Sequence, residues 1–216
     1  MSKKNIVIVG AGPGIGNHVA KKFGRNDFNV VLVSRNQDRL KQYVQELSTE
    51  GVESYAQVAD ASSTESLTKA FEQIAGKYGT IDVLVYNAAS LQAGQPTSLS
   101  SEILMEHYQV DVANALHSVQ QVLPSQLAQK EGTILLTGGG FGLHPVPEFA
   151  AVSAGKAALR ALAFTLAEEL EEQGIFVGTV TIMGNVAPNT HFDPQLIAEK
   201  YWEMYINRKE HEIVYK

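Results

Sequence analysis

Cysteine is absent from this sequence of 216 residues. Without thiols the chain cannot form a disulfide, bind a metal through thiolates or use a cysteine nucleophile, and this favours a reducing, cytoplasmic compartment. A chain of this length buries well over half of the surface of its unfolded state, so it needs neither a disulfide nor a metal to fold. We therefore expect no metal site and a single domain, residues 1–216.

Long apolar runs and an excess of positive charge are also lacking. No apolar stretch approaches the ~18 residues of a membrane-spanning helix, so we expect no membrane segment. The formal net charge of −6 argues against a nucleic-acid-binding surface. Lys3 and Lys4 before the apolar residues 6–9 resemble the start of a signal peptide, but this run is short and ends in glycines, which favours a first β-strand.

Short runs rich in Val and Ile alternate with longer segments of helical period, which is typical of a parallel sheet covered on both faces. We predict strands at about 4–9, 29–33, 53–58, 81–86, 132–137, 176–182 and 212–215. We predict helices at about 14–24, 36–49, 63–77, 101–129, 152–173 and 193–206. Pro124 is expected to kink the long helix 101–129 or to mark its break, because proline lacks the donor that a helix interior requires.

A glycine-rich turn follows the first predicted strand and opens the first predicted helix. Gly10, Gly14 and Gly16 form the pattern GxxxGxG, whereas the widespread GxGxxG pattern fails because residue 15 is Ile15. Glycine lets the backbone approach a ligand closely, and a helix N-terminus favours an anion. The turn therefore predicts a pyrophosphate site; a tight turn without a ligand is the alternative.

The end of the second predicted strand bears on cofactor choice. Proteins that bind NAD through a glycine-rich turn of this type usually place an acidic residue there to hold the ribose hydroxyls. This chain instead has Ser34 followed by Arg35. A carboxylate would repel a 2′-phosphate, whereas serine and a guanidinium can hydrogen-bond to it. We therefore favour NADP(H) over NAD(H). The alternative is that Arg35 is simply a solvated residue at the start of a helix.

Residues 149–159, Phe-Ala-Ala-Val-Ser-Ala-Gly-Lys-Ala-Ala-Leu, resemble the catalytic stretch of the short-chain dehydrogenase/reductases. GxxxGxG is also the arrangement of that family, and the resemblance covers nearly the whole chain. It implies an α/β fold of the Rossmann type, with a doubly wound parallel sheet of about seven strands in three layers. Residues 193–216 would then supply the C-terminal helix and last strand of a single NAD(P)-binding domain.

The resemblance also implies a cofactor site. Asp60-Ala61 is similar to the family's acidic motif at the adenine, and residues 86–89 are similar to its Asn-Asn-Ala-Gly, so that Asn87 would steady the central strands and line the cleft. Together with the glycine turn, these matches predict the following cofactor-binding residues: Gly10, Gly12, Gly14, Ile15, Gly16, Ser34, Arg35, Asp60, Ala61, Asn87, Ala88, Lys156, Gly184 and Val186.

The catalytic positions depart from the family. The tyrosine position, four residues before the lysine, holds Val152; the serine position holds Gly139, and the asparagine position holds Asp111. Lys156 remains as the only residual catalytic residue, with a role in binding the nicotinamide ribose. The alternative for Lys156 is a surface lysine on a helix.

Four residues in segments that flank the cleft in this family are candidate replacement acids: His144, Glu148, Ser153 and His191. Each is individually more typical of a loop or helix-cap residue. Residues 151–155 also resemble a hydrolase nucleophile elbow around Ser153. That elbow requires a strand directly before the serine, and here about fifteen residues of loop are predicted to intervene.

The sequence thus predicts an atypical NADP(H)-dependent oxidoreductase that transfers hydride to or from a small carbonyl, alcohol or enone. A catalytically silent NADP(H)-binding sensor or interaction protein is the alternative. The resemblance further implies a homodimer or homotetramer formed through residues 101–129 and 152–173, although their apolar stripes could equally face the sheet.

Overall fold

The computed structural model describes residues 3–216, which contain one sheet of seven parallel strands in the order β3-β2-β1-β4-β5-β6-β7. The strands are β1 (Lys4–Val9), β2 (Phe28–Ser34), β3 (Ser54–Val58), β4 (Val83–Tyr86), β5 (Gly132–Gly139), β6 (Ile175–Ile182) and β7 (Glu212–Tyr215). Each lies where the sequence predicts a strand, within about two residues, because runs of Val and Ile suit a strand that is buried on both faces.

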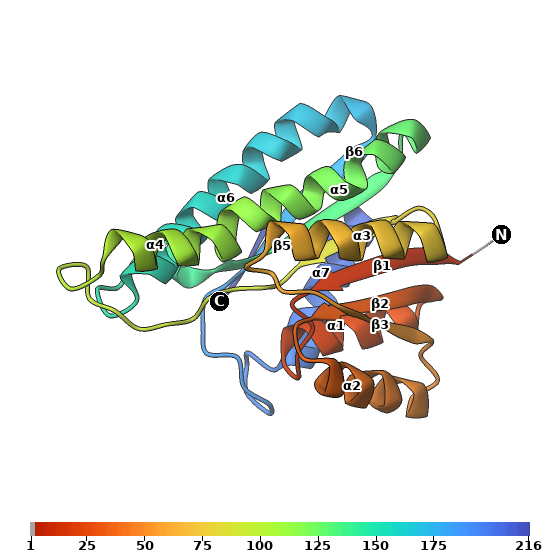
Figure 1. The fold of residues 1–216 in the computed structure, drawn as a ribbon, viewed down its shortest axis with the longest axis horizontal. Helices are drawn as coiled ribbons and strands as arrows, with labels where there is room; N and C mark the ends of the chain where they lie inside the picture. The colour runs from red at the N-terminus through yellow and green to blue at the C-terminus, as the bar shows by residue number, and fades with distance from the viewer. Residues whose placement is uncertain (1–2) are drawn as a thin grey trace.

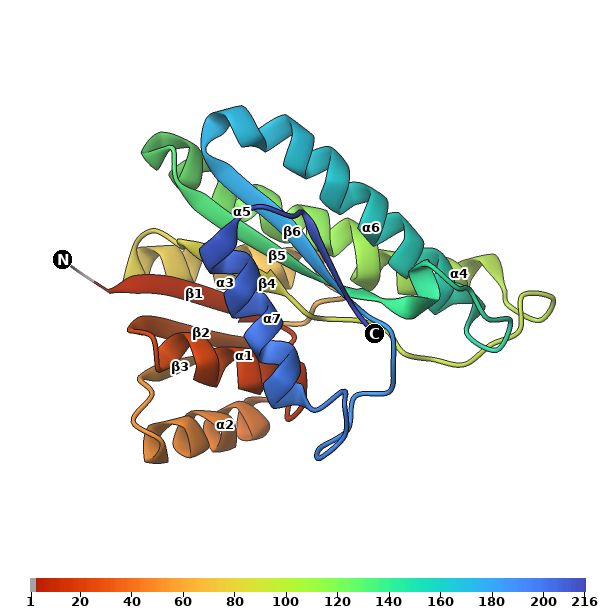
Figure 2. The same ribbon diagram turned by 180° about the vertical axis from the view of Figure 1, so that it is seen from behind.

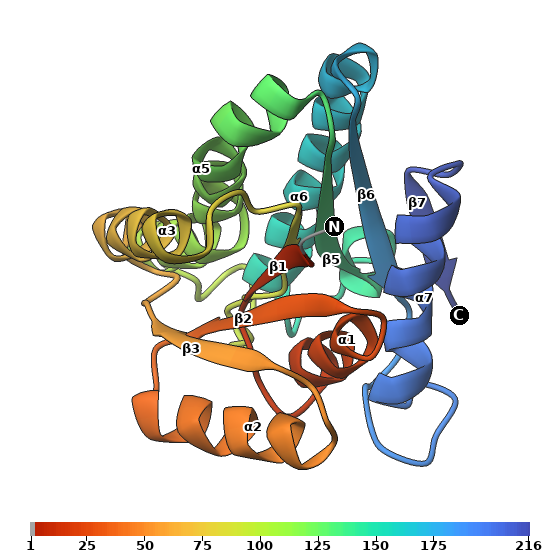
Figure 3. The same ribbon diagram turned by 90° about the vertical axis from the view of Figure 1, so that its right-hand side faces the viewer.

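Helices cover both faces of this sheet, which gives the three layers seen end-on in Figure 3. The α-helices are α1 (Ile15–Gly24), α2 (Gln37–Thr49), α3 (Thr64–Tyr78), α4 (Ser101–Tyr108), α5 (Asn114–Gln129), α6 (Ala150–Leu170) and α7 (Pro194–Asn207). One core lies between the sheet and α3, α5 and α6, and a second lies between the sheet and α1, α2 and α7. The predicted Rossmann-type α/β fold is confirmed.

The prediction of one continuous helix at 101–129 is wrong, because two α-helices, α4 and α5, occupy this stretch (Figure 1). A π-helical segment, Gln109–Ala113, separates α4 from α5, whereas Pro124 lies inside α5 without ending it. The side chain of buried Asn114 fixes the start of α5, since it donates to the Ala61 carbonyl and accepts from the Thr64 hydroxyl. Such π-bulges frequently occur at functional sites.

α6 is a helix of the core. Together with the short turn that follows it, Ala150–Gln173 is long and apolar enough to cross a membrane by length and composition, which corrects the expectation that no stretch reaches that length. Half of that window is nevertheless buried inside the protein, where Leu159, Ala163 and Leu166 pack against the sheet. Such burial is typical of a core helix.

The C-terminal elements complete the second face. α7 lies beside α1 (Figure 2), and Phe23 of α1 contacts Trp202 and Tyr205 of α7 edge-on, with ring centroids 5.1 and 5.4 Å apart. β7 pairs with β6 at the edge of the sheet. Arg160 of α6 and Glu212 of β7 join through two hydrogen bonds of 2.9 and 2.6 Å, which tie this edge strand to the core.

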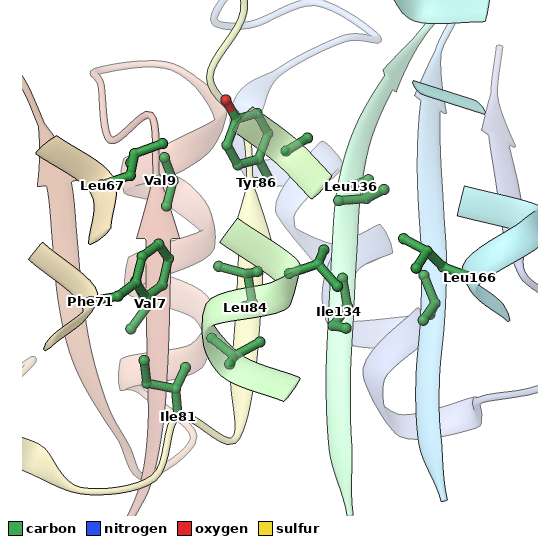
Figure 4. Close-up of a cluster of buried hydrophobic side chains, with 14 of the residues drawn as sticks. Val7, Val9, Leu67, Phe71, Ile81, Leu84, Tyr86, Ile134, Leu136 and Leu166 are labelled. Atoms are coloured by element: carbon green, nitrogen blue, oxygen red, sulfur yellow. The ribbon is translucent and has the colours of Figure 1, made fainter. Parts of the chain in front are cut away.

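The strand order reverses between β1 and β4, the point at which such folds bind ligands beyond the carboxyl ends of their strands. Val7 and Val9 of β1 lie next to Leu84 and Tyr86 of β4 in a close-packed cluster (Figure 4). This packing fixes the relative positions of the two loops that leave these strands. The glycine turn follows β1, and residues 87–92 follow β4.

Candidate cofactor site

A cavity of about 520 Å³ lies at this switch point. Its walls come from the ends of β1, β2 and β4, from the loop after β3, and from the first turns of α2. The residues that line it are Val9, Gly10, Ala11, Gly12, Pro13, Val33, Ser34, Arg35, Asn36, Arg39, Tyr43, Ala59, Asp60, Ala61, Ser62, Asn87, Ala88, Ala89, Ser90, Leu91, Gln92 and Val110. Eight of the predicted cofactor residues therefore share one cavity: Gly10, Gly12, Ser34, Arg35, Asp60, Ala61, Asn87 and Ala88.

The glycine turn forms one wall of the cavity. Gly10 has φ +89°, and a side chain there would collide with the backbone nitrogen of Ala88. Gly12 faces open space in the cavity. Gly16, by contrast, packs α1 against the turn, because a Cβ there would lie 2.9 Å from the Gly10 carbonyl oxygen. Gly14, Ile15 and Gly16 do not belong to the cavity wall.

A chain of hydrogen bonds holds the turn from behind. The Asn87 amide donates to the Gly10 carbonyl at 2.9 Å and accepts from the Thr137 hydroxyl at 3.0 Å. Because that hydroxyl gives its proton to Asn87, it accepts the one from buried Tyr201 of α7, 2.7 Å away. Thr137 and Tyr201 escaped the sequence prediction, since nothing in their local pattern indicates that β5 and α7 meet behind Asn87.

Cationic and hydroxyl groups gather at the other end of the cavity. Ser34 and Arg35 line it at the end of β2, and Arg39 adds a second guanidinium from the first turn of α2. Asp60 faces them, and its carboxylate accepts from the backbone and the hydroxyl of Ser62 at 2.9 and 2.8 Å. These bonds, with a smaller effect of Arg35, lower the pKa of Asp60, so it is an anion at neutral pH.

Lys156 is buried, with 6% of its surface exposed, so the alternative of a surface lysine is wrong. Its ammonium donates to the Thr137 carbonyl at 2.7 Å. Burial lowers the pKa of Lys156, and the nearby charge of Asp111 opposes that effect. Lys156 is not part of the cavity wall, yet it binds the same residue, Thr137, whose hydroxyl holds Asn87.

The positions predicted for the missing serine and tyrosine carry no hydroxyl. Gly139 ends β5, and a Cβ there would meet the Lys156 side chain at ordinary contact distances of 3.5–3.6 Å. Val152, in the first turn of α6, is 1% exposed. Gly184 and Val186 lie outside the cavity wall; a side chain at Gly184 would overlap the ring of Phe192, and Val186 packs near the α7 side of the core.

None of the four candidate replacement acids lies in the wall of the cofactor cavity. His144 and Glu148 are exposed in the loop before α6, and exposed His191 stacks on Tyr215. Ser153 is buried in α6, where its hydroxyl accepts from the Val146 nitrogen at 3.3 Å, and it lines a separate cavity of about 440 Å³. Because the segment between β5 and α6 separates Ser153 from any strand, the nucleophile-elbow alternative is wrong.

A parallel sheet with a ligand cavity at its switch point defines a dinucleotide-binding protein of the Rossmann type. Residues 4–192 match the short chain dehydrogenase family, and the chain belongs to that family. An uncharacterized oxidoreductase of Staphylococcus epidermidis is 30% identical over 181 residues, which cover 84% of this chain and 77% of that protein.

Solved structures agree with this assignment. A metagenomic short-chain oxidoreductase in complex with NADP has a TM-score of 0.89 and 26% identity, covering 98% of this chain and 95% of that one. An alcohol dehydrogenase from the archaeon Thermococcus sibiricus, complexed with 5-hydroxy-NADP, has a TM-score of 0.85 and 25% identity, covering 99% and 97%. The family and the fold predicted from the sequence are thereby confirmed.

Proposed function

We propose that this chain is an NADP(H)-dependent oxidoreductase with a degenerate acid–base centre, acting on a small carbonyl, alcohol or enone. The observation that carries the proposal is the cavity at the switch point, which combines an open glycine turn with two guanidiniums and a serine. The binding of NADP in a similar structure supports it. The whole chain would act as one NAD(P)-binding domain.

The residues present fit the cofactor. Gly12 leaves open space where a pyrophosphate can approach the backbone, and the turn opens α1, whose N-terminus favours an anion. Ser34, Arg35 and Arg39 would hold a 2′-phosphate, and Asp60 and Ala61 would flank the adenine. Asn87 would hold the turn, while Lys156 would reach the nicotinamide ribose from α6.

When bound, the nicotinamide would supply or accept a hydride. The chain's own part is to position the reactants and to handle the proton. We propose that Gly139 and Val152 stand where the family has its serine and tyrosine, so neither position can polarise a carbonyl or donate a proton. General acid–base catalysis is worth about 10²–10⁴-fold, so turnover from positioning alone would be slow. An enone suits such a site best, since hydride can add first and solvent can supply the proton.

The second candidate is a catalytically silent NADP(H)-binding protein. The burial of Val152 and the missing hydroxyl at Gly139 favour it, because the cavity keeps groups that can bind a cofactor while these two positions offer no acid. In that case NADPH would bind without turnover.

The test combines calorimetry with a repaired enzyme. We expect NADPH to bind the wild type, and we expect the double variant Gly139→Ser/Val152→Tyr to reduce ketones about 10²-fold faster or more. The matched control is Gly139→Ala/Val152→Phe, which adds nearly the same volume without hydroxyls. Turnover of a ketone, aldehyde or enone by the wild type would establish the enzyme.

Turnover by the repaired variant alone would favour the silent protein. No NADPH binding by the wild type would overturn both candidates. If Ser/Tyr and Ala/Phe variants gained equally, the assignment of the two positions would be wrong.

A homo-oligomer is a separate proposal. α6 exposes small and apolar side chains along one side, including Ala154, Ala157, Ala161 and, 38% exposed, Phe164. We expect light scattering to give the mass of a dimer or tetramer, and Phe164→Glu to reduce it. A monomeric wild type would contradict this expectation.

A further inference from the structure

Two titratable side chains, Asp111 and Lys156, are buried close to the same turn of α6, although no hydrogen bond joins them within residues 3–216. Asp111 lies in the π-helical segment and is 0% exposed, and Lys156 lies one residue after Gly155 on α6. One Asp111 carboxylate oxygen, Oδ1, accepts from the Ser90 nitrogen at 2.8 Å. The other, Oδ2, is buried and has no hydrogen-bond partner in the protein. A buried carboxylate oxygen without a hydrogen-bond partner is costly to the fold.

The helix has room for this carboxylate because residue 155 has no side chain. A Cβ at Gly155 would lie 2.7 Å from Asp111 Oδ2, closer than packed atoms allow. Asp111 and Gly155 therefore fit together as a pair. The carboxylate rests directly against the backbone of the helical turn that carries Lys156.

We propose that Asp111 is the counter-charge that keeps Lys156 a cation inside the protein. Asp111 would act as a positioning residue: it sets the charge of Lys156, and Lys156 would meet the cofactor. The importance of that charge for binding rests on the function proposed above, but the electrostatic influence of Asp111 on Lys156 does not.

The physical argument is one of burial. Taking an ammonium out of water disfavours its charged form, and burial accordingly lowers the pKa of Lys156, while the Asp111 charge raises it. Burial also raises the pKa of Asp111, while the Ser90 nitrogen, Lys156 and His107 hold it down. Each group thus favours the ion of the other. An asparagine at position 111 could keep the Ser90 bond but would offer no charge.

The remaining titratable groups around the pair do not supply this charge. Within residues 3–216, these are His107 on α4, whose buried ring nitrogens have no hydrogen-bond partner, and Tyr86 on β4. Burial and the Asp111 charge raise the pKa of Tyr86, and its hydroxyl donates to the Val110 carbonyl, so it stays a neutral phenol. One turn further along α6, Arg160 is already paired with Glu212.

The experiment follows the titration of Lys156 itself. The side-chain NMR signals of lysine are recorded against pH in the cofactor-free protein, and the Lys156 signal is identified by its loss in Lys156→Met. In Asp111→Asn we expect the midpoint of the Lys156 titration to fall by about one pH unit or more. Asp111→Asn is nearly isosteric and can retain the Ser90 bond, so the fold should persist.

The matched control is Asp82→Asn. Asp82 is a partly buried carboxylate that accepts from the Asn5 nitrogen at 2.7 Å, at the opposite end of β4. The control should leave the Lys156 midpoint unchanged. Gly155→Ala provides a second variant, because its new methyl group displaces the carboxylate, and it should move the midpoint downward as Asp111→Asn does.

An unchanged Lys156 midpoint in both Asp111→Asn and Gly155→Ala would overturn the proposal, since Asp111 would then be neutral or without influence on the pKa of Lys156. A separate measurement concerns the cofactor: NADPH affinity of Asp111→Asn at pH 8.5 should fall about fivefold or more below that of the wild type, with little difference at pH 6. If the midpoint shifts but NADPH does not bind to the wild type, the pairing stands and the proposed function fails.

Discussion

The two ends of the proposed site are built differently. At the β1–β4 end, backbone geometry makes the cavity: Gly10 has a positive φ, and Asn87 holds its carbonyl. At the β5–α6 end, side chains would have to do the chemistry, and Gly139 and Val152 offer no polar group there. In the function proposed above, the first end keeps the family's pattern and the second departs from it.

This difference separates what the fold requires from what a reaction requires. Gly10 cannot gain a side chain without a collision against the backbone of Ala88, so the fold requires the same backbone geometry as the proposed binding turn. Position 139, by contrast, has room for a Cβ at ordinary contact distance from the Lys156 side chain, so the fold does not require glycine there. A fold of this kind can keep its framework while the residues at its site change.

The largest effect is expected from a substitution in the glycine turn, at the β1–β4 end of the site. Gly10→Ala should abolish NADPH binding and lower the free energy of unfolding by about 2 kcal/mol or more, because φ +89° is strained for alanine and the methyl group meets Ala88. Gly12→Ala, whose methyl group meets only open space, should weaken NADPH binding without changing stability. Calorimetry and urea unfolding measure both. Equal loss of stability in the two variants would contradict this reading of the turn.

The second prediction sharpens the cofactor preference. Arg35→Ala should weaken NADPH binding about 10- to 100-fold while leaving NADH nearly unaffected, since a charge-assisted hydrogen bond is worth about 1.5–3 kcal/mol. Arg39→Ala tests the second guanidinium in the same way. Titrations with both nucleotides give the ratio of affinities, and an equal loss for NADH and NADPH would contradict the placement of a 2′-phosphate here.

The third prediction concerns Thr137, which links the two ends. Thr137→Val should lower the free energy of unfolding by about 1–3 kcal/mol, because it removes a partner from the half-buried Asn87 oxygen and from the buried Tyr201 hydroxyl. Thr179→Val is the control on the neighbouring strand β6, since its buried hydroxyl has no hydrogen-bond partner, and it should be neutral or slightly stabilising. Urea unfolding distinguishes them; equal losses would rule out the network as the cause.

The smallest effect lies at the sheet edge, away from both ends. The Arg160 hydrogen bonds lower the pKa of Glu212, so the pair stabilises the fold above the ordinary glutamate pKa of about 4.3, and this contribution disappears as the pH falls through the lower pKa of the folded state. Glu212→Gln should lower the melting temperature by a few degrees at pH 7 and by much less at pH 3. Exposed Glu65, paired with Lys69, is the control, and Glu65→Gln should show almost no change.

Much of the fold was predictable because local pattern and burial agree. The sequence shows the apolar runs of β1 and β6 and the helical period of α6 directly. The glycine pattern likewise indicates a turn between β1 and α1. The π-helical segment was not predictable, because its apolar spacing continues that of α4 and α5. Arg39 was missed as well, since its place beside Arg35 depends on how α2 starts.

The sequence by itself determined the family, the parallel α/β fold and the place of the glycine turn, because each depends on a local pattern or a short motif. Only the tertiary structure decided that Lys156 is buried, that Asp111 rests against Gly155, and that Tyr201 reaches Asn87 through Thr137. These depend on segments far apart in the chain. Burial and electrostatic coupling belong to the packed structure, and no spacing in the sequence encodes them.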